Sequence, residues 1–329
     1  MDCILEIAVL DYVRNHFHPL WRLRRLAWFR QLQAWIDFPV SRLAGKIRVS
    51  LFWMRDFSRL ISDGSTEPRT ERCFDAILAG FQPDFFWDIG ANIGDYSWRV
   101  ANWSDQTDIW MFEPDALNIK LLRRTISRNR LGRVTLHPIA VSDRCGTVEF
   151  MVDAVSGAAG SILDHTANSW SLHSTYGLSQ KRQVTCVDLD SLREKLQTRR
   201  LLIKLDVEGA EDQVLRGART ILSEVRPIIF LECLDLDRAG NPDLTRIGWL
   251  QELDYLFLNL KEGGNFVAYP GEMRERIETE WLPTEAGAAA SRPSPPAAMT
   301  ASSANQPTPP SPTSTQASSS FPSTPPSAP

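Results

Sequence analysis

The strongest constraint on this chain is a nine-residue segment, FWDIGANIG at 86–94, in which an apolar run gives way to a glycine-containing turn. The run ends in Asp88, glycines follow at Gly90 and Gly94, and a segment of helical pattern begins near Asp95. Because glycine takes positive φ and has no Cβ, a ligand can approach the main chain there. The helix that follows presents unpaired N–H groups at its start. The sequence therefore predicts a strand–turn–helix unit that cradles a nucleoside-like ligand.

A second acidic residue follows the turn at a spacing typical of nucleoside-binding folds. The apolar run Ile109–Phe112 ends at Glu113, about 20 residues after the glycines, where a ribose-binding carboxylate is expected. Pro114 ends the strand, and Asp115 is placed to cap a helix that runs through Asn129. The glycine spacing G-x-x-x-G departs from the dinucleotide fingerprint G-x-G-x-x-G, which disfavours a nicotinamide dehydrogenase.

Two later strands also end in acidic residues. Leu201–Leu205 is a short apolar run followed by Asp206 and Glu208, and Ile228–Leu231 ends at Glu232. In open α/β sheets, ligands bind outside the carboxyl ends of the strands. The acids that follow all four strands are therefore expected to face one crevice.

Five blocks in order resemble the FkbM family of S-adenosylmethionine-dependent methyltransferases. They are DIGANIG at 88–94, FEPDALN at 112–118, AVSD at 140–143, IKLDVEGAE at 203–211 and the strand closing on Glu232. The resemblance implies the Rossmann-like class I methyltransferase fold, an α/β architecture with a doubly wound, mostly parallel seven-stranded sheet. It also implies S-adenosyl-L-methionine as cofactor and transfer of its methyl group to a hydroxyl of a sugar, glycan or natural product.

The resemblance assigns roles to particular residues. The cofactor-binding set that it implies is Asp88, Gly90, Asn92, Gly94, Glu113, Ala140 and Asp143. The resemblance also implies an acceptor contact from Ser161, in the GAAGSIL run at 157–163. From their positions in the chain, acceptor contacts are also expected from His165, in the polar stretch 155–180, and from Glu232, which alternatively contacts the cofactor or simply ends a buried strand. His137, which precedes Pro138, is interpreted as a packed histidine.

Methyl transfer to an alcohol requires removal of the hydroxyl proton, which calls for a general base or for a divalent cation such as Mg²⁺. Asp206 is the first candidate for either role, with Glu208 beside it as the second catalytic residue. His165 or His173 is the alternative base. Asp206 and Glu208 also admit a structural interpretation, as caps of a helix over residues 209–222.

The first 65 residues differ from the rest in charge and are expected to form a basic, tryptophan-rich helical extension, the leader. Residues 1–60 carry ten Arg or Lys against five Asp or Glu, a net charge of +5, which leaves −9 for the remainder. Trp21, Trp28 and Trp35 recur every seven residues in a helix expected over 19–37. This stripe is interpreted first as packing against the domain or a second copy of the chain, and otherwise as peripheral contact with an anionic membrane.

Composition limits the remaining possibilities. The methyltransferase domain is expected over residues 66–283, and its sheet is expected to end in a hairpin of Tyr255–Leu260 and Asn265–Tyr269. Residues 284–329 are rich in Ala, Ser, Thr and Pro and are expected to be a disordered tail. The five scattered cysteines and the lack of a signal peptide or of ~18 consecutive apolar residues favour a cytoplasmic location, with peripheral membrane association as the alternative.

A small-molecule or glycan acceptor is expected as the partner. The negative balance outside the leader gives no broad phosphate-binding surface, so nucleic acid is not expected. The alternative to an enzyme is a non-catalytic scaffold that uses the same fold and acts through its leader and tail.

Overall fold

The computed structural model describes residues 35–56, 59–60, 67–153, 161–162, 179–196, 200–233 and 245–282, with isolated positions at 26, 28 and 32. The side chains at 153, 161, 179 and 180 are not described. Most of the predicted leader, His165 and His173, and the predicted tail at 284–329 lie outside these residues.

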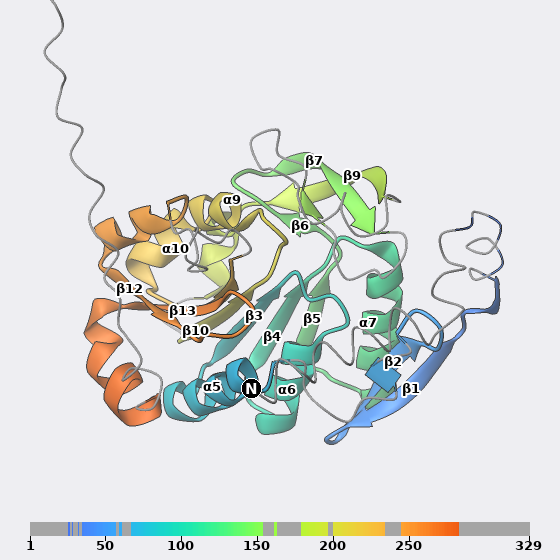
Figure 1. The fold of residues 1–329 in the computed structure, drawn as a ribbon, viewed down its shortest axis with the longest axis horizontal. Coiled ribbons are helices and arrows are strands. Elements are labelled where there is room, and N and C mark those ends of the chain that lie inside the picture. The colour runs from blue at the N-terminus through green and yellow to red at the C-terminus, as the bar shows by residue number, and fades with distance from the viewer. Residues whose placement is uncertain are drawn as a thin grey trace, which may run out of the picture. The chain divides into compact units, whose positions relative to one another are not determined.

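A seven-stranded sheet organises the domain expected over residues 66–283 (Figure 1). Its strands, from one edge to the other, are β12 (Tyr255–Asn259), β13 (Asn265–Pro270), β11 (Ile228–Glu232), β10 (Leu201–Leu205), β3 (Phe85–Ile89), β4 (Asp108–Phe112) and β5 (Val134–His137). Only β13 runs against its neighbours, and it pairs antiparallel with both β11 and β12. The predicted mostly parallel, doubly wound sheet and its closing hairpin are thereby confirmed.

Helices cover both faces of this sheet, as right-handed crossovers require. α5 (Pro68–Phe81), α6 (Asp95–Trp103) and α7 (Ala116–Asn129) contribute to one core, which buries alternate strand residues such as Phe86 and Phe230. α9 (Glu211–Arg216) and α10 (Arg219–Glu224) cover the opposite face, where Trp87 and Leu205 are buried (Figure 1). Successive side chains of a strand point to opposite faces, so neighbouring residues belong to different cores.

The order of the strands reverses between β3 and β10. From β3 the chain builds outward through β4 and β5, and from β10 it builds the other way through β11. Such a switch point opens a crevice at the carboxyl ends of the two strands. Here that position is occupied by Gly90, which follows β3, and Asp206, which follows β10.

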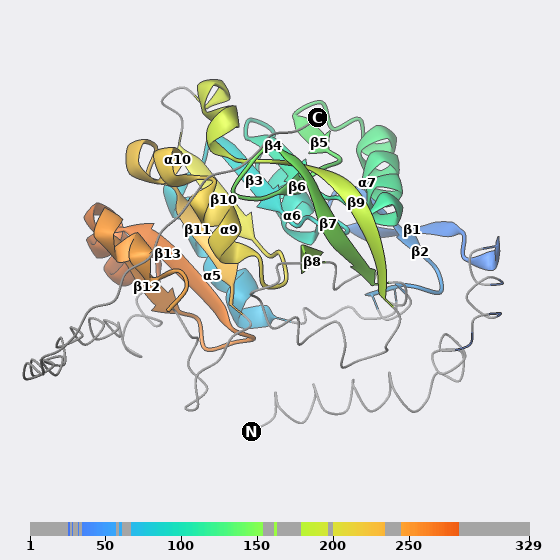
Figure 2. The same ribbon diagram turned by 90° about the horizontal axis from the view of Figure 1, so that it is seen from above.

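A second, four-stranded sheet was not expected from the sequence. It has the order β6 (Ala140–Val141), β9 (Ser179–Val187), β7 (Gly146–Asp153), β8 (Ser161–Ile162). β7 and β9 form a long antiparallel ribbon, visible in Figure 2. Their pairing joins residues more than 25 positions apart in the chain, which explains why no local turn signal predicts it.

The helix predicted over 209–222 is wrong in one respect, because two helices replace it. The chain bends at Gly217, where an added Cβ would lie 2.1 Å from the backbone oxygen of Ser142. The second helix, α10, starts anew because the Asp190 carboxylate accepts hydrogen bonds from the backbone N–H groups of Thr220 and Ile221, both at 2.9 Å. The N-cap residue of α9 is Ala210, which offers no side-chain cap, and capping by Asp206 and Glu208 stays a prediction.

An antiparallel hairpin is formed by β1 (Pro39–Ala44) and β2 (Ile47–Phe52). The sequence around residues 46–57 has no clear hydrophobic period that would predict it. β2 lies against α7, whose side chains complete its hydrogen bonding: Ser50 N donates to Thr125 Oγ1 at 2.9 Å and Arg48 N donates to Asn129 Oδ1 at 2.8 Å. The hairpin therefore packs against α7, although it lies within the predicted leader at 1–65.

Two tryptophans of the predicted stripe, Trp28 and Trp35, are described, and both are exposed to solvent. Trp28 is 57% exposed and Trp35 is 90% exposed, and Leu32 is also exposed. These residues do not support the expectation that the stripe packs against the domain, and contact with a membrane or a second copy stays a prediction. None of the described helices has the length and apolar character needed to cross a membrane.

Candidate active site

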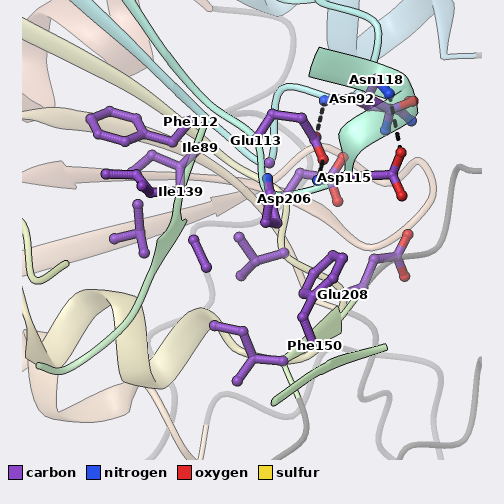
Figure 3. Close-up of a pocket in the computed structure, with 16 residues that line it drawn as sticks. Ile89, Asn92, Phe112, Glu113, Asp115, Asn118, Ile139, Phe150, Asp206 and Glu208 are labelled. Carbon is purple, nitrogen blue, oxygen red and sulfur yellow. Dashed lines mark hydrogen bonds between the residues drawn. The ribbon is translucent and has the colours of Figure 1, made fainter. Parts of the chain in front are cut away.

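A cleft opens at the switch point, with part of its roughly 650 Å³ of empty space open to solvent. Its apolar lining is Ile89, Phe112, Pro114, Ile139, Ala140, Val141, Phe150, Ile162 and Val207, and the other lining residues are Gly90, Asn92, Glu113, Asp115, Asn118, Asp206 and Glu208. Figure 3 shows Glu113 and Asp115 at one end and Ile89, Phe112 and Ile139 at the other. An apolar surface beside a few converging polar groups suits a nucleoside, whose base is flat and whose sugar carries hydroxyls.

Glu113 is held rigidly at the end of β4. Its carboxylate accepts hydrogen bonds from the backbone N–H groups of Asn92 and Asp115, both at 2.7 Å (Figure 3). The side chain is buried, and this burial, opposed by the backbone hydrogen bond from Asp115, raises the pKa of Glu113 to about 8. A carboxyl group fixed at this position can form hydrogen bonds with two vicinal hydroxyls.

The turn after β3 brings main chain and cleft together as its glycines predict. Gly90 has φ of 78°, and a Cβ placed on it would lie 1.8 Å from the backbone oxygen of Asp206. Asn92 adopts φ of 52°, in the left-handed region, and thereby turns its N–H toward Glu113. Both residues line the cleft. Gly94 does not; it begins α6, and a Cβ there would meet the Trp98 ring at 2.6 Å.

Asp88 lies on the opposite face of the sheet from the cleft, because Ile89 next to it faces the cleft. Its Oδ2 accepts hydrogen bonds from Ser97 N at 3.1 Å and Ser97 Oγ at 2.5 Å, which fixes the first turn of α6. Burial raises the pKa of Asp88 to about 6, against the lowering effects of Ser97 and Lys204. The cleft lining thus brings together Glu113 and Asp206 but does not include Asp88, whose role in cofactor binding stays a prediction.

Asp206 and Glu208 enter the cleft from the loop after β10. The Asp206 side chain is 35% exposed and forms an ion pair of 3.5 Å with the buried Lys204 ammonium. Glu208 has φ of 54°. An exposed carboxylate anchored by a buried cation is suitably placed to take a proton from a hydroxyl that enters the cleft.

The other predicted site residues have different positions. Ala140 is buried in the cleft wall, whereas Asp143 lies outside the lining and pairs with Arg144 at 3.0 Å. Ser161 lies on β8 opposite Met151, without a described side chain, and His165 is outside the described residues. Glu232 ends β11, on the same face as Lys204 and away from the cleft lining. His137 stacks on Phe112 with ring centroids 4.8 Å apart, as a packed histidine should.

Sequence reasoning missed several residues of the site. Asp115 was expected only as a helix cap; it does accept hydrogen bonds from Leu117 N and Asn118 N, at 2.8 and 3.1 Å, but it also lines the cleft. Phe150 and Ile162 reach the cleft from the second sheet, which no sequence signal had placed there.

The described residues provide no obvious cation site. Within the described ranges, no group of three or more His, Cys, Asp or Glu side chains is arranged to hold a metal ion. The metal-binding role of Asp206 stays a prediction.

Comparison with known proteins identifies the domain. The model of the methyltransferase FkbM domain matches residues 88–257, just over half of the 329-residue chain. The chain belongs to the FkbM methyltransferase family. It is therefore a methyltransferase, and the region from β3 to β12 that carries the cleft is the part shared with other members of the FkbM family.

Individual relatives are distant from this FkbM-family chain. A curated protein, the 2-O-methyltransferase NoeI of Sinorhizobium fredii, is 25% identical over 197 residues, covering 55% of this chain and 76% of that protein. Among solved structures, a methyltransferase from Geobacter sulfurreducens is 15% identical with a TM-score of 0.38, covering 66% of this chain and 86% of that one. The O-methyltransferase from Bacillus cereus in complex with SAH is 16% identical with a TM-score of 0.35, covering 79% and 96%.

Proposed function

We propose that this FkbM-family protein is an S-adenosyl-L-methionine-dependent O-methyltransferase that acts on a hydroxyl of a sugar, glycan or natural product. The observation that supports this most is the convergence of Glu113, Asp206 and the Gly90 turn on one cleft at the switch point of the sheet. The family name supports methyl transfer, and the name of NoeI supports oxygen as the acceptor atom.

The residues of the cleft fit the proposed cofactor. Glu113 is positioned to accept hydrogen bonds from ribose hydroxyls, and the Asn92 and Asp115 amides keep its carboxylate in place. Ile139, Val141 and Phe150 offer the apolar surface for the adenine base. When bound, the cofactor would supply an electrophilic methyl group on its sulfonium.

Asp206 is the proposed general base. As the acceptor oxygen forms its bond to the methyl carbon and the carbon–sulfur bond breaks, the hydroxyl proton passes to the Asp206 carboxylate. The ion pair with Lys204, at 3.5 Å from Oδ2, holds the Asp206 side chain at the cleft. Positioning of the hydroxyl against the methyl group supplies the rest of the catalysis.

The proposal is tested by calorimetry and isotope transfer. Wild-type protein should bind S-adenosylmethionine, and Glu113→Ala should abolish the binding heat. Incubation of cell extract with protein and isotopically labelled methyl donor should yield a methylated hydroxyl compound detectable by mass spectrometry. Retention of full cofactor affinity in both Asp88→Ala and Glu113→Ala would reject the assignment of the site.

A further inference from the structure

Exposed apolar side chains concentrate at the start of the described chain. Of the nine large apolar side chains that are exposed in the described ranges, seven lie between residues 26 and 43. Single exposed apolar residues are normal on a protein surface, but a concentration of them in one segment marks a contact site. Trp35 is 90% exposed, Leu43 is 65% exposed and Phe38 is 59% exposed. The seven residues are Leu26, Trp28, Leu32, Trp35, Ile36, Phe38 and Leu43.

Hydrogen bonds fix the middle of this segment to the end of the β1–β2 hairpin. Asp37 Oδ1 accepts a hydrogen bond from Met54 N at 2.8 Å, and Trp53 Nε1 donates one to Ile36 O at 2.7 Å. The ring of Phe38 packs against that of Trp53, with the ring centroids 6.0 Å apart. These contacts hold the backbone in place while the apolar side chains stay exposed, so the exposure is a property of the folded chain.

Positive charge accompanies the apolar segment. The hairpin, residues 39–52, contains three basic residues and no acidic one, and α7 contains four basic residues and no acidic one. The whole chain has a net charge of −4, so this region is opposite in sign to the average. The hairpin and α7 lie side by side in both Figure 1 and Figure 2. The seven basic residues are Arg42, Lys46, Arg48, Lys120, Arg123, Arg124 and Arg128.

Six of these seven basic side chains are exposed, and no carboxylate of the described residues forms an ion pair with any of the six. Lys120, Arg124 and Arg128 follow one another at four-residue spacing, which places them on one side of α7. Leu117, three positions before Lys120 and 51% exposed, lies on the same side. The Lys120 ammonium lies 5.7 Å from the centroid of the Phe52 ring at the end of β2, so this side of the helix borders the hairpin.

We propose that the apolar segment at 26–43, the hairpin and the basic side of α7 form a docking face for a membrane surface that carries anionic phospholipid. A bilayer interface accepts both parts of such a face. Tryptophan and leucine side chains enter the boundary between head groups and acyl chains, while Lys and Arg remain among the phosphates. An anionic leaflet adds electrostatic attraction for each basic residue near its surface.

Two other occupants match only one part of the docking face. A second copy of the chain would set basic face against basic face in a two-fold dimer, so like charges would repel. A nucleic acid would pair its phosphates with the cations and stack its bases on the tryptophan rings, but the aliphatic side chains of the segment would stay in water. The anionic membrane uses both the cations and the apolar side chains.

Vesicle sedimentation with the full chain tests the docking face. The wild-type protein should sediment with phosphatidylcholine vesicles that contain about 30% phosphatidylserine, and should bind vesicles of phosphatidylcholine alone at least about tenfold more weakly. Salt screens the attraction between surface charges, so raising NaCl from about 0.1 M to about 1 M should reduce the sedimented fraction.

Two sets of substitutions separate the basic part from the apolar part. Each basic residue near an anionic membrane contributes about fivefold in affinity, so the triple variant Lys120→Gln, Arg124→Gln, Arg128→Gln should bind on the order of 100-fold more weakly. The double variant Trp35→Ser, Leu43→Ser should bind about tenfold more weakly, because two apolar side chains no longer leave water. All five side chains are exposed, so the thermal unfolding midpoint should stay unchanged.

Matched variants serve as controls. The triple variant Lys195→Gln, Arg216→Gln, Arg219→Gln removes the same charge from exposed positions over the opposite face of the main sheet. The double variant Trp35→Phe, Leu43→Ile keeps the apolar character of the segment. Both controls should bind the anionic vesicles with wild-type affinity.

The proposal is overturned if the wild type does not sediment with the anionic vesicles, if it binds phosphatidylcholine vesicles equally well, or if either test variant binds as its control does. A dimer that Trp35→Ser, Leu43→Ser dissociates, without vesicle binding, would assign the face to a second copy instead. Binding to single-stranded RNA without vesicle binding would assign it to a nucleic acid. Methyl transfer is not measured, so none of these results bears on the proposed function.

Discussion

Gly90→Ala should show most sharply whether the contact between β3 and β10 holds the site together. The added Cβ would lie 1.8 Å from the backbone oxygen of Asp206. Real Cβ contacts hardly occur below 3.0 Å, so the two backbones would have to move apart by 1.2 Å, the difference between these distances. The residue also has φ of 78°, which alanine adopts at a cost of about 1–3 kcal/mol. Overpacking adds about 1–3 kcal/mol, so we expect a loss of about 2–6 kcal/mol of unfolding free energy.

The same shift displaces the proposed base. Misplacement of a reacting group by about 1 Å costs on the order of 100-fold in rate, so methyl transfer by Gly90→Ala should fall by that factor. Stability is measured by urea unfolding and transfer by release of SAH.

Two glycines separate the causes of this effect. Gly146 has φ of 146° but open space where a Cβ would lie, and Gly132 has open space and no positive φ. Gly146→Ala should lose only the free energy of unfolding that the strained backbone costs, about 1–3 kcal/mol, and should keep the wild-type rate of methyl transfer. Gly132→Ala should change neither the free energy of unfolding nor the rate. The reasoning is refuted if Gly90→Ala transfers methyl groups as fast as Gly146→Ala.

Three further predictions concern single residues. Glu113 has a pKa of about 8 in the folded chain and about 4.5 when unfolded, so the free energy of unfolding should fall as pH rises through this window, by up to about 1.4 kcal/mol per pH unit. Glu113→Gln should therefore make the thermal stability less dependent on pH between about pH 5 and 8. The same slope of stability against pH in the wild type and the variant would contradict this. Asp115→Ala should lose about 1 kcal/mol in urea unfolding, because the first turn of α7 loses its cap, and no loss would show that the cap is dispensable. Treatment with EDTA should leave methyl transfer unchanged if Asp206 acts as a base without a metal; loss of activity that Mg²⁺ restores would contradict that role.

Much of the main sheet could be predicted because its strands are short apolar runs that end in acids or glycines. The runs at 85–89, 108–112, 201–205 and 228–232 each carry their own boundary signal, and the hairpin at 255–270 carries its turn. The second sheet lacks such signals, since β7 and β9 depend on each other across a long intervening segment.

The sequence predicts that the site lies at the carboxyl edge of the sheet, but it does not predict which face of the sheet each acidic side chain points to. The carboxyl-end rule brings Asp88, Glu113 and Asp206 to one rim, but strand alternation decides that Ile89 faces the cleft and Asp88 the opposite core. Tyr96 meets Lys204 only through the tertiary fold, so no spacing in the sequence indicates this contact.

The central claim, that the cleft between Gly90, Glu113 and Asp206 holds the methyl donor, is tested most directly by a crystal structure of the protein with S-adenosylhomocysteine. The account predicts adenosine against Ile139 and Phe150, ribose hydroxyls on the Glu113 carboxylate and the sulfur facing Asp206. A ligand bound elsewhere, or ribose hydroxyls that do not contact Glu113, would contradict it.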